Sequence, residues 1–160
     1  MLKEVSGDIL LSKAQVIAHG VAPADHFNQG LALSLREQYP AMAKDFRHYC
    51  QVSHPKAGDL WTWAGADGKR VVNLMVQDEA PSAQSRPGKA STHNVNSALR
   101  NLRQLVEEEG FESLALPRLA TGVGGLDWEE VKPLIENHLG DLQIPVYLYT
   151  TFHAGEQAGE

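Results

Sequence analysis

Three glycines within four positions, in the stretch 119–128 (LATGVGGLDW), constrain the fold of this chain more than any other feature. The apolar run SLALP (113–117) before them fits a buried strand that ends at Pro117. After them, Asp127 and Glu130 have the spacing of a capping box at a helix start. Glycines expose backbone N–H groups, and a nearby helix start adds positive potential, so this strand, loop and helix suit a phosphate or diphosphate. The alternative is a tight turn without a ligand. A P-loop is excluded, because no Lys-Ser/Thr pair follows the glycines.

Apolar runs and helical patterns alternate along the rest of the chain. Strand patterns occupy 14–21, 59–65, 69–76 and 144–152, and the middle two form a hairpin with a turn at Asp67-Gly68. Helical spacing covers 30–38 and 41–52, and a long helix is capped by Ser91 or Thr92. A further helix starts at Asp127 and contains Pro133, which implies a kink or a late start. This order predicts one α/β domain over residues 1–152, a three-layer α/β/α fold with a central mixed sheet. Residues 153–160 (HAGEQAGE) are polar and glycine-rich, and we expect a flexible tail there.

The loops that follow strands are the expected ligand site, because α/β folds bind ligands at the carboxyl ends of their strands. We expect loops 19–32 and 121–126 to form one cleft. The irregular segment 77–91 is either a functional lid or a surface excursion.

Composition narrows the classes of function. A net charge of −6 over 160 residues argues against an extended nucleic-acid-binding surface. No apolar stretch is long enough to span a membrane, so no membrane contact is expected. A single cysteine, Cys50, cannot form an internal disulfide, which points to the cytoplasm. Because His48, Cys50 and His54 match no standard zinc spacing, we expect neither a metal nor a cofactor.

Three segments in order resemble the macrodomain family, which binds ADP-ribose. They are VSGDI (5–9), AHGVAPADHFNQGLALSLREQYP (18–40) and LPRLATGVGGLDWEEV (116–131), and the resemblance covers about residues 3–151. The pairs at 18–19 and 117–118 and the triplet at 126–128 are similar to one subgroup. That subgroup contains terminal ADP-ribose protein glycohydrolases and antitoxins that remove ADP-ribose from DNA.

The resemblance implies a set of residues around ADP-ribose. Asp8 would accept a hydrogen bond from the adenine amino group, as a carboxylate can, and Tyr149 or Phe152 would pack against the base. A bulky residue at Gly122 or Gly124 would block the diphosphate. The full expected set is Asp8, Ile9, His19, Gly20, Asn28, Gly30, Leu31, Ala32, Asn73, Pro117, Thr121, Gly122, Val123, Gly124, Gly125, Leu126 and Tyr149.

Three positions depart from the subgroup's catalytic pattern. Gln77 stands where the protein glycohydrolases carry a lysine, Gly124 replaces an aspartate and Ala22 replaces a serine. Glutamine is neither a nucleophile nor a base, so lysine chemistry at this position is lost. Asp25 and His26 are the candidate general bases, and the alternative is a solvent-exposed loop pair.

Two functions follow from the resemblance. One is hydrolysis of an ADP-ribosyl linkage on a protein or a nucleic acid, or of ADP-ribose 1″-phosphate. The alternative is a non-catalytic reader of ADP-ribose. A related ligand, such as another nucleotide or NAD, also fits a loop that contacts only phosphates.

Overall fold

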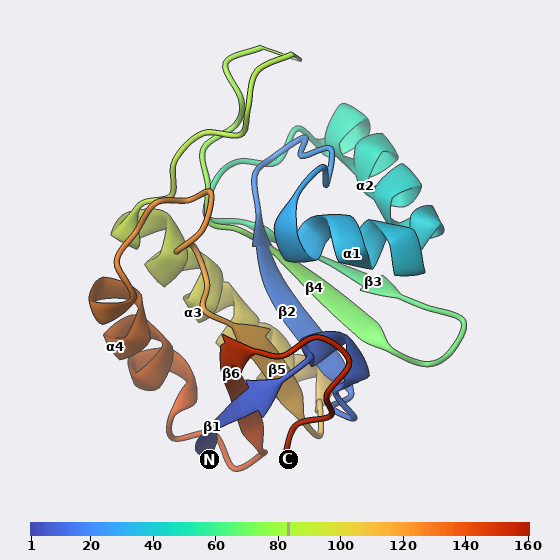
Figure 1. Ribbon diagram of the computed structural model, residues 1–160. Helices are drawn as coiled ribbons and strands as arrows, with labels where there is room; N and C mark the ends of the chain where they lie inside the picture. The colour runs from blue at the N-terminus through green and yellow to red at the C-terminus, as the bar shows by residue number, and fades with distance from the viewer. Residues whose placement is uncertain (83) are drawn as a thin grey trace.

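The computed structural model describes residues 1–82 and 84–160. It consists of one mixed sheet with helices on both faces (Figure 1). The strands are β1 (Leu2–Gly7), β2 (Val16–Val21), β3 (Leu60–Ala64), β4 (Arg70–Met75), β5 (Leu114–Pro117) and β6 (Val146–Phe152). The helices are α1 (Gly30–Gln38), α2 (Pro40–Ser53), α3 (Thr92–Glu109) and α4 (Trp128–Leu139), with a short 3-10 helix over Ile9–Leu11.

The strand order is β1-β6-β5-β2-β4-β3. Neighbouring strands run parallel except at the edge, where β3 pairs antiparallel with β4 as the predicted hairpin. Because the other strands run in one direction, the segments after β1, β2, β4, β5 and β6 all leave the same edge of the sheet. Loops 19–32 and 121–126 therefore meet at one edge, as predicted.

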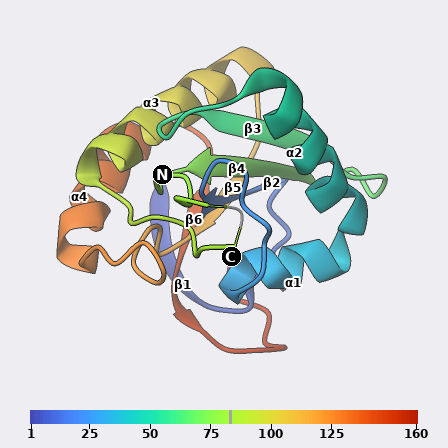
Figure 2. The same cartoon turned by 90° about the horizontal axis from the view of Figure 1, so that it is seen from above.

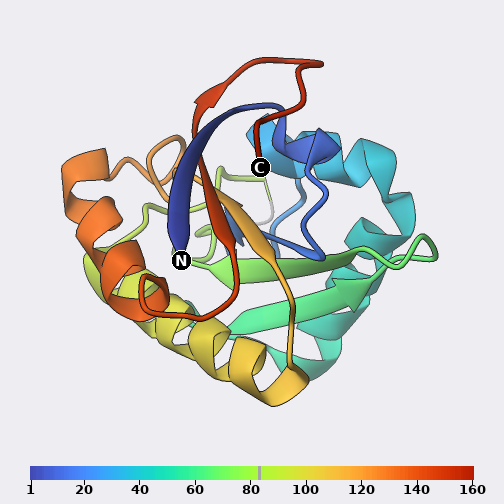
Figure 3. The same ribbon diagram turned by 90° about the horizontal axis from the view of Figure 1, so that it is seen from below.

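Helices cover both faces of the sheet, as Figures 2 and 3 show from opposite sides, and core clusters lie under them on each face. Alternation along β2 sends Val16 and Ala18 into a cluster with α3 and α4. Val21 points the other way, into a cluster with α1 and α2 that contains Phe27 and Phe46. The three-layer α/β/α fold predicted from the sequence is thus confirmed.

Helix boundaries agree with the sequence to within two residues, and two details differ from it. Ser91 caps α3, since its hydroxyl accepts from the amide of Asn94 at 3.1 Å. Asp127 precedes α4 without a side-chain capping bond, so the capping box does not form. The helix continues through Pro133 instead of starting after it.

The C-terminal residues 153–160 fold back onto the domain, where the sequence predicts a flexible tail. Ala158 is buried beside Val5 and Ile9. The Glu160 carboxylate accepts from the hydroxyls of Ser12 and Tyr149, each at 2.5 Å, and from the amide of Lys13 at 3.0 Å. The Glu160 carboxylate thus anchors a segment whose polar, glycine-rich composition predicts flexibility.

Within the described residues, the structure contains no helix that is both long and apolar enough to cross a membrane.

Candidate functional site

A cavity of about 1030 Å³ opens at the edge where the parallel strands end. Its walls come from the loop after β2, the loop after β5, the segment after β4 and one side of α2. A volume of this size lies at the upper end of the range for small-molecule sites. The cavity contains these residues of the predicted site: His19, Gly20, Asp25, His26, Asn28, Gly30, Leu31, Ala32, Pro117, Gly122, Val123 and Gly124.

The glycine loop presents free backbone amides to this cavity. Gly125 donates to the carbonyl of Gly122 at 3.1 Å and Leu126 to that of Ala120 at 2.9 Å, which closes the loop on itself. Gly125 has a φ of +76°, a conformation that favours glycine. Among the described residues, the amides of Gly122, Val123 and Gly124 donate to no acceptor. Three successive unpaired amides in a cavity wall are able to donate hydrogen bonds to an anion.

The start of α1 supplies a second set of free amides. Gln29, the N-cap residue, makes no capping bond with its side chain, and Gly30 takes a positive φ of 64° at the first helical position. The first amides of a helix have no intrahelical acceptor, and the helix dipole adds positive potential there. Gly30, Leu31 and Ala32 line the same cavity as the glycine loop. Two sets of amides therefore converge on one space.

His19 lies in the cavity wall as a buried, neutral imidazole. Its Nε2 lies 2.6 Å from Oδ1 of Asn73, whose Nδ2 donates to the carbonyl of Trp61 at 3.4 Å. Because the Asn73 oxygen can only accept, the proton sits on Nε2 of His19. Burial lowers the pKa of His19 to about 4, with the Asn73 bond opposing that shift. His19 is thus uncharged at neutral pH, and Asn73, which does not line the cavity, orients the ring through this hydrogen bond.

The candidate bases Asp25 and His26 line the cavity without forming a hydrogen-bonded pair among the described residues. The two oxygens of Asp25 accept from the amides of Ala22 at 2.9 Å and Phe27 at 2.8 Å, so this carboxylate shapes its own loop. His26 is exposed. Cys50 also lines the cavity, but burial raises the pKa of its thiol, which opposes a role as nucleophile.

Gln77 ties the segment after β4 to the site. Its side-chain Nε2 donates to the carbonyl of Gly88 at 3.0 Å, and the residue is 7% exposed. Further along, the amide of Ala90 donates to the carbonyl of Gly124 at 3.0 Å. Lys89 is exposed and does not line the cavity. At the position where the resemblance implies a catalytic lysine, this chain has Gln77, whose side chain stabilises the loop that leads to Gly88.

Asp8 and Tyr149, which were predicted to contact the base, lie outside the cavity and are hydrogen-bonded to the C-terminal segment. The two oxygens of Asp8 accept from the amides of Leu10 and Gly155, each at 3.0 Å. Phe152 is 68% exposed. The predicted site residues that do not line the cavity are Asp8, Ile9, Asn73, Thr121, Gly125, Leu126 and Tyr149.

Sequence reasoning missed four arginines that line the cavity, namely Arg36, Arg47, Arg86 and Arg118. Arg36 donates to the carbonyl of His26 at 3.1 Å and to Oδ1 of Asn28 at 2.8 Å, which holds the first loop in place. The sequence signals were the resemblance of the pair at 117–118, which contains Arg118, and the helical spacing of Arg47 with its neighbours on α2.

Residues 1–82 and 84–160 contain no group of three or more His, Cys, Asp or Glu side chains placed to hold a metal ion.

Comparison with known proteins points to one family. The sequence profile of the Macro domain family matches residues 18–135. A DNA ADP-ribosyl transferase–DNA ADP-ribosyl glycohydrolase fusion protein of Thermosipho africanus is 28% identical over 160 residues, which cover 92% of this chain and 41% of that protein. The chain therefore spans about two fifths of that relative's length.

Solved structures share the fold. The macrodomain of Thermus aquaticus DarG has a TM-score of 0.81 and 24% identity, over 94% of this chain and 98% of that one. DarTG of Thermosipho africanus in complex with ADP-ribose also has a TM-score of 0.81, with 23% identity, over 98% of this chain and 42% of that one.

Proposed function

The chain belongs to the Macro domain family, and on that premise we propose that it binds an ADP-ribosyl group at the strand-end cavity and hydrolyses the bond to its carrier. The carrier is a protein, a nucleic acid or, in ADP-ribose 1″-phosphate, a phosphate. Relatives named as DNA ADP-ribosyl glycohydrolases support the hydrolytic part of the proposal.

The observation that carries the binding proposal is the convergence of two sets of free amides. The amides of Gly122 to Gly124 and those at the start of α1 line one cavity from different elements. A diphosphate carries two negative charges and many acceptor oxygens, so it satisfies both sets at once. The neutral His19 beside them adds a polar group without adding charge.

We propose that the base binds at Asp8, which lies outside the cavity and next to residues 153–160. Asp8 is the proposed acceptor for the adenine amino group, and each carboxylate oxygen can accept a second hydrogen bond beyond those from Leu10 and Gly155. Tyr149 is buried in the same cluster as Ile9, and Phe152 is exposed.

Hydrolysis is proposed to use water, because Gln77 cannot form a covalent sugar adduct. Water attacks C1″ of the distal ribose, the bond from C1″ to the carrier breaks with its electrons leaving on the carrier, and the water's proton passes to a base. His26 and Asp25 are the proposed bases at the cavity wall, and Asn28 helps to orient ribose or water. Asn73 acts indirectly, by holding His19.

A reader that binds ADP-ribose without cleaving it is the second candidate. The observation that favours it is the cavity wall, which contains no lysine among the described residues, with Gln77 bonded to Gly88.

One set of measurements separates these functions. We expect free ADP-ribose to give measurable heat in a calorimetric titration. For a substrate that wild type cleaves, His26→Ala should slow release of ADP-ribose by about 10²–10⁴-fold, the usual scale for a positioned base. Lys89→Ala is the matched control, because this side chain lies outside the cavity, and Gln77→Lys tests whether a lysine increases the rate.

The proposal has clear points of failure. No heat at millimolar ADP-ribose would refute binding. If a folded Lys89→Ala variant no longer released ADP-ribose, hydrolysis would depend on a lysine and the water-based mechanism would be wrong. Tight binding without release from modified peptide, modified DNA or the 1″-phosphate would identify a reader.

A further inference from the structure

The cavity is larger than the two ligand loops require, because it extends onto α2. Residues 43, 47, 50, 51 and 54 of this part of the chain all line it. Helical spacing places residues 43, 47, 50 and 51 on one side of α2, and His54 directly follows the helix. The facing wall is made by segments 79–82 and 84–87. Figure 2 shows α2 and the glycine loop on opposite sides of the molecule seen from above, and residues of both line the cavity.

This cavity carries positive charge in a protein whose net charge is −6. Four of the seven arginines of the chain line it, and none of the four forms an ion pair with a carboxylate among the described residues. The lining carboxylates are those of Asp25 and Glu79, and both oxygens of Asp25 already accept backbone hydrogen bonds. The excess positive charge is therefore available to an anionic ligand.

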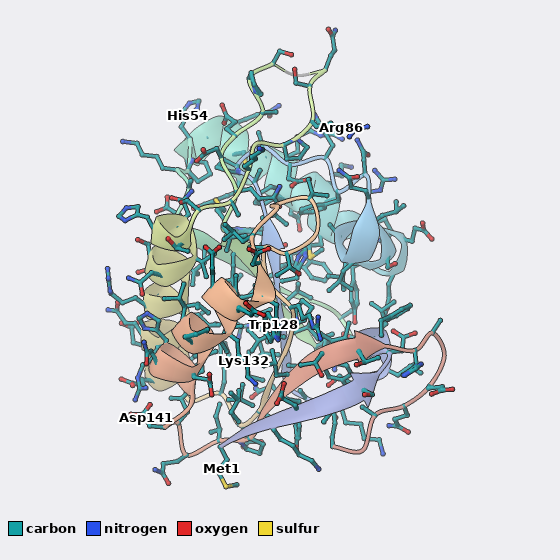
Figure 4. All side chains as sticks on the ribbon, turned by 60° about the vertical axis from the view of Figure 1, so that its left-hand side comes forward. Met1, His54, Arg86, Trp128, Lys132 and Asp141 are labelled. Atoms are coloured by element: carbon teal, nitrogen blue, oxygen red, sulfur yellow. The ribbon has the colours of Figure 1, made fainter. Side chains whose placement is uncertain are left out.

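The four arginines divide into two groups. Arg118 adjoins the glycine loop and stacks over Trp128, with its Cζ 5.3 Å from the ring centroid. Arg36 is bonded to the first loop. In contrast, Arg47 and Arg86 make no side-chain hydrogen bond among the described residues. Figure 4 shows Arg86 at the same end of the molecule as His54, the residue that follows α2.

A diphosphate accounts for only part of this charge. Its two negative charges are met by the free amides and Arg118, on the glycine-loop side of the cavity. The distal ribose that follows it is neutral and needs no guanidinium. Arg47 and Arg86, which line the cavity together with Gln51 and His54, are left for a further anionic group.

We propose that the α2 side of the cavity is a phosphate subsite, in which Arg47 and Arg86 bind a phosphate carried on or next to the distal ribose. This inference rests on the proposed function and narrows its substrate class to ADP-ribosyl groups whose carrier is itself a phosphate or contains one. The phosphate is either the 1″-phosphate of a small metabolite or a phosphodiester of a modified nucleic-acid strand. Both present the same oxygens to a guanidinium.

Affinity ratios test the subsite. Dissociation constants are measured for free ADP-ribose, ADP-ribose 1″-phosphate, an ADP-ribosylated oligonucleotide and an ADP-ribosylated peptide without phosphate. We expect wild type to bind at least one phosphate-bearing ligand about tenfold more tightly than free ADP-ribose, the order of one charge-assisted hydrogen bond. Arg47→Gln and Arg86→Gln should each bring that ratio close to one. Arg100→Gln is the matched control, since Arg100 is exposed on α3 outside the cavity and its loss should keep the wild-type ratio.

Salt gives a second readout. The advantage of the phosphate-bearing ligand should shrink as ionic strength rises, because exposed charges are screened. Preference for the 1″-phosphate identifies a small metabolite, and preference for the oligonucleotide identifies a nucleic-acid carrier.

Two results would overturn the subsite. One is equal affinity of wild type for free ADP-ribose and both phosphate-bearing ligands, and the other is a peptide that binds as tightly as they do. In either case binding of free ADP-ribose persists. Failure of the proposed function looks different, because no ADP-ribosyl ligand would then bind at all.

Discussion

At the scale of single residues, His19 shows how burial sets the chemistry of the cavity wall. Its side chain lies next to Phe27, which belongs to an aromatic cluster, and is hydrogen-bonded to Asn73 on the neighbouring strand β4. Desolvation favours the neutral ring, so the pKa falls from 6.5 to about 4 although the Asn73 bond and the charge of Asp25 oppose this change. A neutral ring can accept a hydrogen bond from ribose or water, whereas an imidazolium would only donate.

We predict that protonation of His19 destabilises the fold between pH 6.5 and about 4. In this pH window His19 is protonated in the unfolded chain but stays neutral in the folded chain. The contribution of the neutral ring to stability is therefore complete above pH 6.5 and is lost as pH falls to about 4. The loss is on the order of 3 kcal/mol at most, since one pKa unit corresponds to about 1.4 kcal/mol. Urea unfolding of wild type and His19→Gln at stepped pH measures it. Wild type should lose more stability than the variant across the window, and parallel profiles would contradict the prediction.

At the scale of elements, the glycine loop and the segment after β4 form one unit. The amide of Ala90 donates to Gly124, and a Cβ built on Gly124 would lie 2.7 Å from the carbonyl oxygen of Ala120 and 2.9 Å from Cβ of Ala90. A Cβ on Gly122 meets no atom within 4 Å. The sequence treats the two glycines alike, as positions where bulk blocks a diphosphate. The structure separates them, because only Gly124 is packed against the protein itself.

Gly124→Ala should therefore destabilise the protein by about 1–3 kcal/mol, the usual cost of overpacking. Gly122→Ala is its control and should change the free energy of unfolding by less than about 0.5 kcal/mol. Urea unfolding gives both values, and hydrogen exchange at the Ala90 amide should speed up only in Gly124→Ala. Equal stability of the two variants would show that the loop adapts to the added carbon.

At the scale of the whole molecule, the C-terminal segment joins parts of the chain that are far apart in sequence. Asp8 and Glu156 are bonded through their backbones at 2.7 Å, and Glu160 reaches both Ser12 and Tyr149. Figure 3 shows this segment crossing beside β1 and the 3-10 helix. The segment lies against Asp8, where the base is proposed to bind. The same residues therefore affect both the stability of the fold and the access of the ligand.

Glu160→Gln should weaken this closure, with Glu156→Gln as the matched control. Glu160 accepts three hydrogen bonds, whereas the Glu156 side chain makes no hydrogen bond or ion pair among the described residues. We expect a loss of about 1–2 kcal/mol in the free energy of unfolding for Glu160→Gln only.

A phenol titration provides a second measurement. Burial, and then the bond to Glu160, raise the pKa of Tyr149 above its ordinary value. The tyrosine pKa should therefore fall in Glu160→Gln and stay unchanged in Glu156→Gln. If both variants behave like wild type, the segment contributes no closure in solution.

The sequence by itself determined the elements and the ligand loops. Apolar spacing predicted the helices and every described strand except β1, because burial repeats with the period of each element. The glycines at 122, 124 and 125 predicted an anion-binding loop because only a bare backbone exposes its amides so closely. These signals are local, and their order along the chain was enough to indicate the fold and both walls of the cleft.

Tertiary structure alone decided which side chains share the cavity. His19 and Asn73 are 54 positions apart and meet because β2 pairs with β4. Arg47 and Arg86 face one space only once α2 and the segment after β4 are placed on the same edge. The C-terminal residues look loose in sequence because their partners Asp8, Ser12 and Tyr149 lie elsewhere in the chain. Contacts between distant residues leave no period in the sequence, so only the folded chain reveals them.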